Sequence, residues 1–407
     1  MTPSGAPPGP KLRRALGLPL LVFYGLGTII GAGIYVAIGE VVGRAGGAAP
    51  LAFALAGAVA ALTGLSYAEL AARHPEAAGA AAYVEAAFHS PVLSRAVGLV
   101  TIAVGIISAA SIARGAAGYI QQFVPLPDAI GAAIVVALFA AIACLGVRES
   151  VASAAVLTIL EIAGLLTVVG VGVAVVLHDS VDVAALAPTG AELWPGIPAG
   201  AFVAFFAFLG FETLANMAEE ARDVGHTLPR AILLSIAAAT LIYLAVAAVA
   251  VVVVPDVELG GSPAPLCLVL GRAGLPCEPA FSAVALIAIG NGVLVEIMMV
   301  ARLAYGMARR GWLPTPLAAV AGTTHIPLRA TLLAGAAVLG FAVLVDFGVL
   351  VNLASGLILG VFATANLALM RLHRRAPRAD LAFRAPRWTP PFGVAASLAL
   401  IAAALLA

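Results

Sequence analysis

The chain has 407 residues, of which 63% are hydrophobic and 10% are charged, and its mean hydropathy is +1.11. Soluble domains carry about 25% charged residues, so this composition excludes an ordinary soluble protein and favours a helical protein that crosses a membrane many times. A net charge of +1 does not indicate a nucleic-acid partner, and the continuous apolar runs are not the alternating pattern of a membrane β-barrel.

Eleven apolar segments are candidates to cross a hydrocarbon core of about 30 Å, which needs about 20 residues. These predicted spans are 17–42, 50–71, 95–120, 129–146, 154–177, 197–218, 230–254, 279–303, 330–345, 349–370 and 391–407. The ninth and the last are short by this measure. The sequence therefore predicts an all-α polytopic protein with a tail over 1–16, a core over 17–370, a basic loop over 371–390 and an eleventh helix over 391–407.

Arginine and lysine are distributed unevenly between the two sides. With the N-terminus inside, eighteen of these residues fall in inner loops or at inner span ends, and only Arg44 and Arg272 fall in outer loops. Cytoplasmic loops carry such an excess, so we expect a multi-pass protein of the cytoplasmic membrane with its N-terminus inside. Cys267 and Cys277 then face outward, either as a disulfide or as two free thiols.

The first span contains Gly27-Thr28-Ile29-Ile30-Gly31-Ala32-Gly33-Ile34-Tyr35. Each glycine costs up to about 1 kcal/mol against alanine inside a helix, so Gly31-Ala32-Gly33 can interrupt the helix in mid-membrane. Irregular backbone at that depth occurs only where protein buries it or where it lines a cavity. The alternative is that these glycines allow close helix packing.

The sixth span favours the first interpretation, because Gly210 and Glu212 interrupt its apolar run. Spans one and six are five places apart and cross in opposite directions. Broken helices at corresponding positions of two halves indicate an inverted-repeat transporter with its site at the bilayer midplane. The two predicted repeats are spans one to five, about 17–177, and spans six to ten, about 197–370.

Four segments, in order and at matching positions, resemble the amino acid–polyamine–organocation permeases, which have the LeuT-type fold. They are the stretch Gly27–Tyr35; Ser66-Tyr67-Ala68-Glu69-Leu70 with Pro75–Gly79 and Tyr83; Phe205–Glu212 with Leu228-Pro229-Arg230; and Asn291-Gly292 with Ala301–Arg309. The resemblance covers nearly the whole chain. It implies a secondary transporter that moves amino acids by alternating access, by proton symport or exchange.

The resemblance also implies where substrate binds. The carboxylate would meet amides of the first break, around Ile30, Gly31, Ala32 and Gly33, because a half-helix N-terminus favours anions. The α-amine would meet carbonyls of the second break, at Phe206, Ala207 and Leu209 beside Gly210, with Phe208 and Phe211 as candidates to line or gate the pocket. The apolar surroundings favour neutral amino acids, whereas an acid in the pocket, such as Glu212, would favour basic amino acids or polyamines.

Buried acids are expected to couple transport to a proton gradient. A sodium gradient is not expected, because no serine or threonine occurs from Ala283 to Leu303 to form the sodium site of similar proteins. Glu161 lies in span five where some proton-coupled relatives have a lysine. A charged carboxylate is costly inside a span, so Glu161 either binds and releases a proton or stays protonated as a structural plug. Glu296 in span eight either shares a proton or water network with Glu161 or has a simple packing role. Glu69 is expected to pair with a loop arginine, and Arg114 needs an anionic partner.

Other function classes receive little support. The six histidines lack metal-ligand spacing and no phosphate-binding loop is present, so no enzyme activity, metal or cofactor is expected. The alternatives that remain are a transporter of polyamines or other organocations and a transport-inactive nutrient sensor on the same fold. The expected partners are an amino acid, protons and the bilayer, and the oligomeric state is open.

Overall fold

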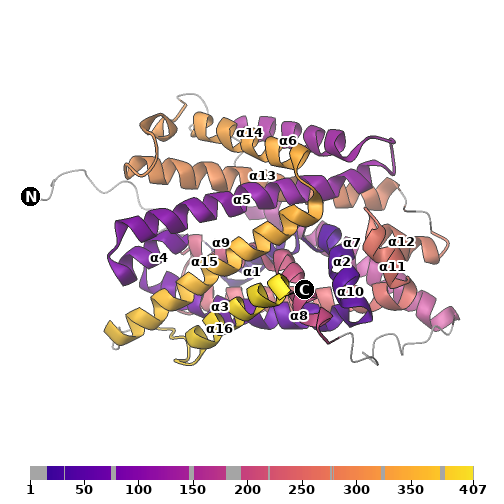
Figure 1. Ribbon diagram of the computed structural model, residues 1–407, viewed down its shortest axis with the longest axis horizontal. Helices are drawn as coiled ribbons and strands as arrows, with labels where there is room; N and C mark the ends of the chain where they lie inside the picture. The colour runs from indigo at the N-terminus through magenta and orange to yellow at the C-terminus, as the bar shows by residue number, and fades with distance from the viewer. Residues whose placement is uncertain are drawn as a thin grey trace, which may run out of the picture.

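The computed structural model describes residues 16–31, 33–74, 79–145, 151–179, 194–218, 221–275, 277, 279–321, 326–375 and 381–406. Within these ranges the protein is an all-α bundle of long apolar helices (Figure 1). Nine of the eleven expected spans are single helices: α3 (Ala49–Arg73), α5 (Pro91–Ile120), α6 (Asp128–Cys144), α7 (Val151–Asp179), α10 (Thr227–Val253), α13 (Pro279–Arg309), α14 (Leu328–Leu344), α15 (Phe347–Arg375) and α16 (Thr389–Leu406).

The other two spans are broken, as predicted. Span one consists of α1 (Leu18–Ile30) and α2 (Gly33–Ala45). Span six consists of α8 (Gly196–Ala204), the 3-10 turn η4 (Phe205–Phe208) and α9 (Phe211–Asn216). Both interruptions fall at the glycines that the sequence singles out.

Several helices extend beyond the apolar segments that predicted them. Span eight was expected to end at 303 and span ten at 370, whereas α13 continues to Arg309 and α15 to Arg375. Arginine side chains can keep their heads in water while their stems cover apolar surface, so a helix continues past the point where hydropathy ends. Within the described part, α14 is short, as expected, with 17 residues.

Helices at corresponding places of the two predicted repeats contact each other. The equivalent helices of the two repeats pack against each other, in the pairs α3–α10, α5–α13 and α6–α14. Glycines seven residues apart allow close approach in two of these pairs. Gly57 and Gly64 of α3 lie against side chains of α10, and Gly98 and Gly105 of α5 lie against side chains of α13.

Short helices cover the two ends of the bundle. In Figure 1, α4 (Gly79–Phe88) lies at one end, whereas α11 (Asp256–Gly261) and α12 (Pro265–Arg272) lie at the other. The apolar side of α4 is buried in the protein at Tyr83, Val84 and Ala87, against α5 and α15. A disulfide joins Cys267 to Cys277, which decides between the two alternatives for these cysteines.

Candidate functional site

The break in span one is a sharp change of direction at Gly31, whose φ and ψ are 8° and −132°. The Gly31 amide donates to the Gly27 carbonyl at 3.2 Å, so this amide still belongs to α1 and is not freed as the sequence suggested. Ala32 lies outside the described residues. The helix α2 begins at Gly33, and the first four N–H groups of a helix have no acceptor within it. The amides that can receive an anion are therefore those of the first turn of α2.

The break in span six is at Leu209 and Gly210. Gly210 has a φ of +118°, a conformation that only glycine adopts readily. A Cβ atom here would also overlap the backbone carbonyl of Thr28. Glycine is thus required at this position for two independent reasons, backbone conformation and contact with the other broken helix.

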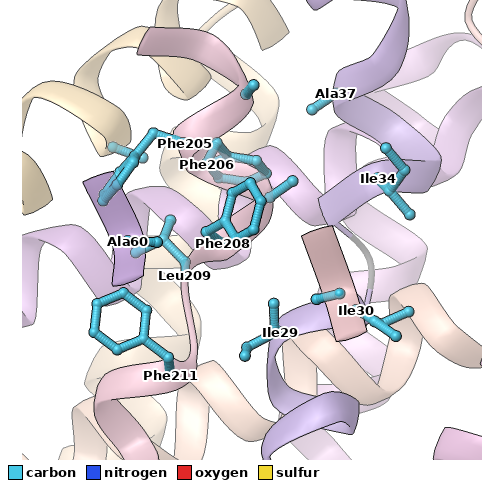
Figure 2. Close-up of a cluster of buried hydrophobic side chains, with 14 of the residues drawn as sticks. Ile29, Ile30, Ile34, Ala37, Ala60, Phe205, Phe206, Phe208, Leu209 and Phe211 are labelled. Atoms are coloured by element: carbon cyan, nitrogen blue, oxygen red, sulfur yellow. The ribbon is translucent and has the colours of Figure 1, made fainter. Parts of the chain in front are cut away.

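The two breaks lie against each other. A Cβ atom at Gly33 would come within 2.7 Å of the Ala207 Cα, so the start of α2 meets η4 backbone to backbone. Figure 2 shows the side chains of the two breaks in one buried cluster, with Ile29 and Ile30 on one side and Phe208 and Leu209 on the other. The first and second repeats therefore share one site.

Three hydroxyl groups donate to backbone carbonyls at or near the breaks. The Tyr243 hydroxyl, from α10, is 2.8 Å from the Ile29 carbonyl and 2.9 Å from the Ala207 carbonyl. The Thr28 hydroxyl lies 3.0 Å from the Gly25 carbonyl and 3.2 Å from the Gly210 carbonyl, to which the Thr213 hydroxyl also donates at 2.6 Å. Because a hydroxyl has a single proton, Tyr243 and Thr28 each serve two carbonyls with one donor.

A cavity lies beside the breaks. It is lined by residues of α1, α2, α5, α7, α9, α13 and both interruptions, including Thr28, Ser108, Phe206, Asn291 and Glu296. About 50 Å³ is open to the centres of water molecules. Since one water needs roughly 10–15 Å³ by this measure, the cavity holds a few waters, and a larger solute requires its walls to move.

The predicted site residues divide into two groups. Gly31, Gly33, Phe206, Leu209 and Gly210 line the cavity. Ile30, Ala207 and Phe208 are fully buried behind it. The Phe208 ring packs on Tyr243 with centroids 5.2 Å apart and points towards Gly57 of α3.

The buried acids have different surroundings. Glu296 lines the cavity. Glu161 is 1% exposed, and its backbone carbonyl accepts a 2.9 Å hydrogen bond from Tyr35. Glu212, in the first turn of α9, accepts a 2.9 Å hydrogen bond from the Gly210 amide. This hydrogen bond stabilises the break in span six.

The side of the cavity away from the N-terminal end of α1 is closed. Gly39 of α2 packs against the Leu259 carbonyl of α11, and Gly118 of α5 packs against Pro263. Arg44 of α2 donates to Asn352 of α15 at 2.9 Å. The predicted need of Arg114 for an anion is met by Asp346 at 3.4 Å. These contacts join both repeats across the closed side.

Comparison with known proteins places this architecture in a family. The sequence model described as amino acid permease matches residues 16–407. The chain belongs to the amino acid permease family. It is 28% identical over 397 residues to the methylthioribose transporter of Bacillus subtilis (strain 168), covering 92% of this chain and 85% of that protein. It is 28% identical over 401 residues to the branched-chain amino acid permease BcaP of the same organism, covering 92% and 84%.

A third relative of this chain is the uncharacterized transporter Rv1999c of Mycobacterium tuberculosis. The two are 33% identical over 365 residues, which cover 89% of this chain and 81% of that protein. These relatives are named as transporters or as a permease, and the match to the family model confirms the family that the four sequence motifs suggested. Their named substrates differ, so membership of the permease family does not by itself select one.

Sequence reasoning missed the hydroxyl groups of the permease site. Tyr243 lies in an apolar run of α10 with no motif around it. Thr158 of α7 lines the cavity one turn before Glu161 and donates to the Phe23 carbonyl at 3.2 Å. A polar side chain within an otherwise apolar span was the available signal, because such residues usually find a partner inside the bundle.

Proposed function

We propose that the protein is a secondary active transporter that moves amino acids across the cytoplasmic membrane by alternating access. The observation that carries this proposal is the meeting of two broken helices, one from each repeat, around a single cavity in a chain matched by the amino acid permease model over residues 16–407. Irregular backbone at membrane depth is tolerated where it lines a cavity, and such breaks form the substrate sites of inverted-repeat transporters.

The backbone of the breaks supplies both halves of a zwitterion site. The first turn of α2, starting at Gly33, offers amides and the positive end of a helix dipole to the substrate carboxylate. The Ala207 and Ile29 carbonyls share a single proton from Tyr243. Each carbonyl has two lone pairs, so an ammonium group can donate to the same carbonyls while Tyr243 stays in place.

The arrangement of contacts supports one state of an alternating-access cycle. The cavity extends along the half of the bundle formed by α1, α9 and the later part of α13, while α11 and α12 cover the opposite end. With the N-terminus inside, as the arginine distribution predicts, the cavity is directed towards the cytoplasm and the outer side is closed. Transport then requires the contacts between α2, α11 and α15 to separate.

Glu161 is the proposed coupling residue. Its carboxyl group is buried in α7, and its backbone carbonyl is bonded to Tyr35 of α2, the helix whose first turn would bind substrate. Movement of α2 therefore changes the surroundings of Glu161. A carboxyl group that alternates between two such environments can bind a proton in one and release it in the other.

Uptake of labelled amino acids into proteoliposomes tests the proposal. The panel is measured with an inward proton gradient, with a sodium gradient and with neither, for the wild type and Glu161→Gln. We expect uptake driven by the proton gradient in the wild type, and loss of this dependence in Glu161→Gln. Exchange that needs no gradient and survives the substitution would contradict the coupling role. No flux of any amino acid would contradict the proposed function itself and favour a sensor or another substrate class.

A further inference from the structure

The cavity beside the helix breaks has one carboxylate in its wall. Among the described residues that line it, Glu296 alone has an acidic or basic side chain, and the others are small, apolar or hydroxyl- and amide-bearing. Glu212, which the sequence suggested as the acid that would change substrate preference, lines no part of the cavity and is occupied with the Gly210 amide. Glu296 is therefore the acidic group that an entering solute meets.

Glu296 is held between two helices in an incomplete hydrogen-bonded arrangement. Ser108 of α5 lines the same cavity and lies near enough to act on the Glu296 carboxyl group. Within the described part of the chain, its Oε2 atom is buried with no hydrogen-bond partner, and it lies against Gly105, where a Cβ atom would be 3.2 Å away. A carboxylate can accept about four hydrogen bonds, so most of its capacity is unused.

No described cation compensates this carboxylate. The next basic residue along α13 is Arg302, whose side chain is exposed. Glu212 on α9, which acts on Glu296 electrostatically, is also acidic. An unpaired charge within a bundle is strongly unfavourable. A charged Glu296 therefore needs a cation that enters the cavity.

We infer that Glu296 selects substrates that carry a positive charge on their side chain, with Ser108 holding the carboxyl group in place. This inference rests on the proposed function and narrows it. The zwitterionic end of the substrate lies at the two breaks, and its side chain extends across the cavity towards α13, where Gly292 leaves room beside Glu296. The preference for neutral amino acids suggested by the sequence is thereby reversed, because the acid comes from span eight rather than span six.

Ornithine and norleucine provide a matched test, since their side chains have the same number of heavy atoms and differ in a terminal ammonium or methyl group. Initial uptake of both is measured in proteoliposomes at one proton gradient. The wild type is expected to favour ornithine in kcat/KM by about tenfold to a hundredfold, the range of a hydrogen bond to a charged group. Glu296→Gln should remove this preference, and Glu296→Asp should retain part of it.

Glu85→Gln is the control variant, because Glu85 is part-exposed on α4 and pairs with Arg310 at 3.7 Å, away from the cavity. It should keep the wild-type ratio of ornithine to norleucine. Equal uptake of the two substrates by the wild type would overturn the inference and leave the proposed function standing. It would also be overturned if Glu296→Gln abolished the proton dependence of both substrates without changing their ratio, since Glu296 would then carry the coupled proton.

Discussion

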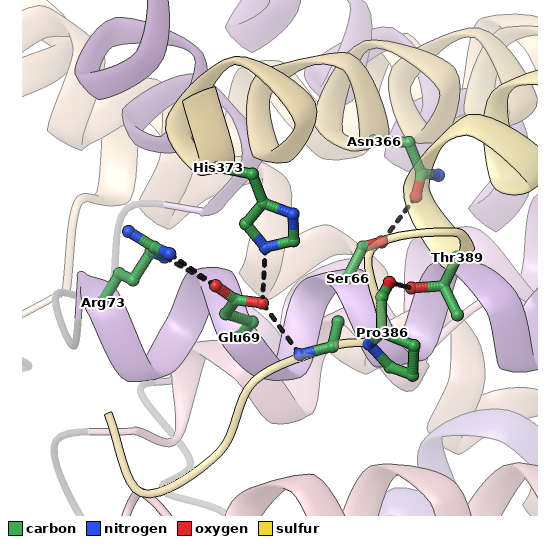
Figure 3. A network of polar contacts seen from close by, with 8 residues as sticks. Ser66, Glu69, Arg73, Asn366, His373, Pro386 and Thr389 are labelled. Carbon is green, nitrogen blue, oxygen red and sulfur yellow. Dashed lines mark hydrogen bonds and ion pairs between the residues drawn. The ribbon is translucent and has the colours of Figure 1, made fainter. Parts of the chain in front are cut away.

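Two buried polar regions of this protein are built on opposite principles. At the helix breaks, neutral hydroxyls such as Tyr243 and Thr28 each share one proton between two carbonyls. The second region lies where the end of α3 meets the end of α15. Here Glu69 of α3 is fully buried, but its carboxylate accepts several hydrogen bonds. One oxygen accepts from Arg73 at 2.6 and 2.9 Å, and the other accepts from His373 at 2.9 Å and the Ala385 amide at 2.8 Å (Figure 3).

The difference separates scaffold from site. Four hydrogen bonds to Glu69 fix α3, the end of α15 and the segment before α16 in one arrangement, and Ser66 and Asn366 continue the contact at 2.6 Å (Figure 3). A fully satisfied network of this kind rigidifies a structure. The breaks, by contrast, retain unused acceptor capacity, which a ligand can fill. At the breaks, this unused capacity lies beside the cavity, so a solute that enters can fill it.

Removing the Glu69 carboxylate should have the largest effect. Glu69→Ala leaves the buried Arg73 guanidinium and the Ala385 amide without their partner, and breaking such a buried pair costs about 3–5 kcal/mol. We expect the apparent unfolding midpoint in detergent to fall by about 5–10 °C. Glu85→Ala removes a half-exposed ion pair and should change the midpoint by less than about 1 °C. An unchanged midpoint in Glu69→Ala would show that the network is not a scaffold.

Gly210→Ala should abolish transport while the protein remains folded. The substitution places a Cβ atom on a residue with φ of +118° and against the Thr28 carbonyl, so the two breaks cannot keep their contact. We expect kcat/KM for uptake to fall more than about a hundredfold, since about 2.7 kcal/mol is enough for that loss. Gly170→Ala is the matched control, because a Cβ there meets nothing within 4 Å. Wild-type uptake by Gly210→Ala would contradict the account.

Tyr243→Phe should have a smaller effect that is specific to substrate binding. The change removes the hydroxyl that holds the Ile29 and Ala207 carbonyls side by side. The KM for an amino acid should rise about tenfold, in line with the loss of a buried hydrogen bond. Tyr83→Phe is the control, because within the described residues the Tyr83 hydroxyl is buried without a partner. Equal KM values for the two variants would mean that Tyr243 does not position the carbonyls.

The sequence predicted the architecture better than the contacts within it. Glycine positions locate both breaks because glycine acts through the local backbone, and hydropathy locates the spans because the bilayer sets their length. Contacts between spans could not be predicted in the same way. Glu69 was expected to bind a loop arginine, whereas its arginine partner is Arg73 of its own helix, and no partner could be named for Arg114. Membrane helices are apolar on most faces, so hydropathy does not reveal which face meets which neighbour.

The chemistry of the cavity also depends on helix rotation. The sequence identified Glu212 and Glu296 as acids within spans, but only the fold shows that Glu212 accepts from the Gly210 amide and that Glu296 lines the cavity. Likewise, only the fold shows that the Gly31 amide remains bonded to Gly27. These are tertiary facts about single atoms, and a span with many apolar residues gives no pattern from which to derive them.

The central claim is that backbone groups of the two breaks recognise the two charges of an amino acid, and competition by derivatives tests it most directly. The methyl ester of the preferred substrate lacks the carboxylate, and its N-acetyl derivative lacks the ammonium. Each is added to the proteoliposome uptake assay with the labelled parent amino acid. We expect that neither derivative inhibits uptake at a concentration at which the unlabelled parent blocks it fully. Inhibition by both derivatives as strong as by the parent would contradict the account.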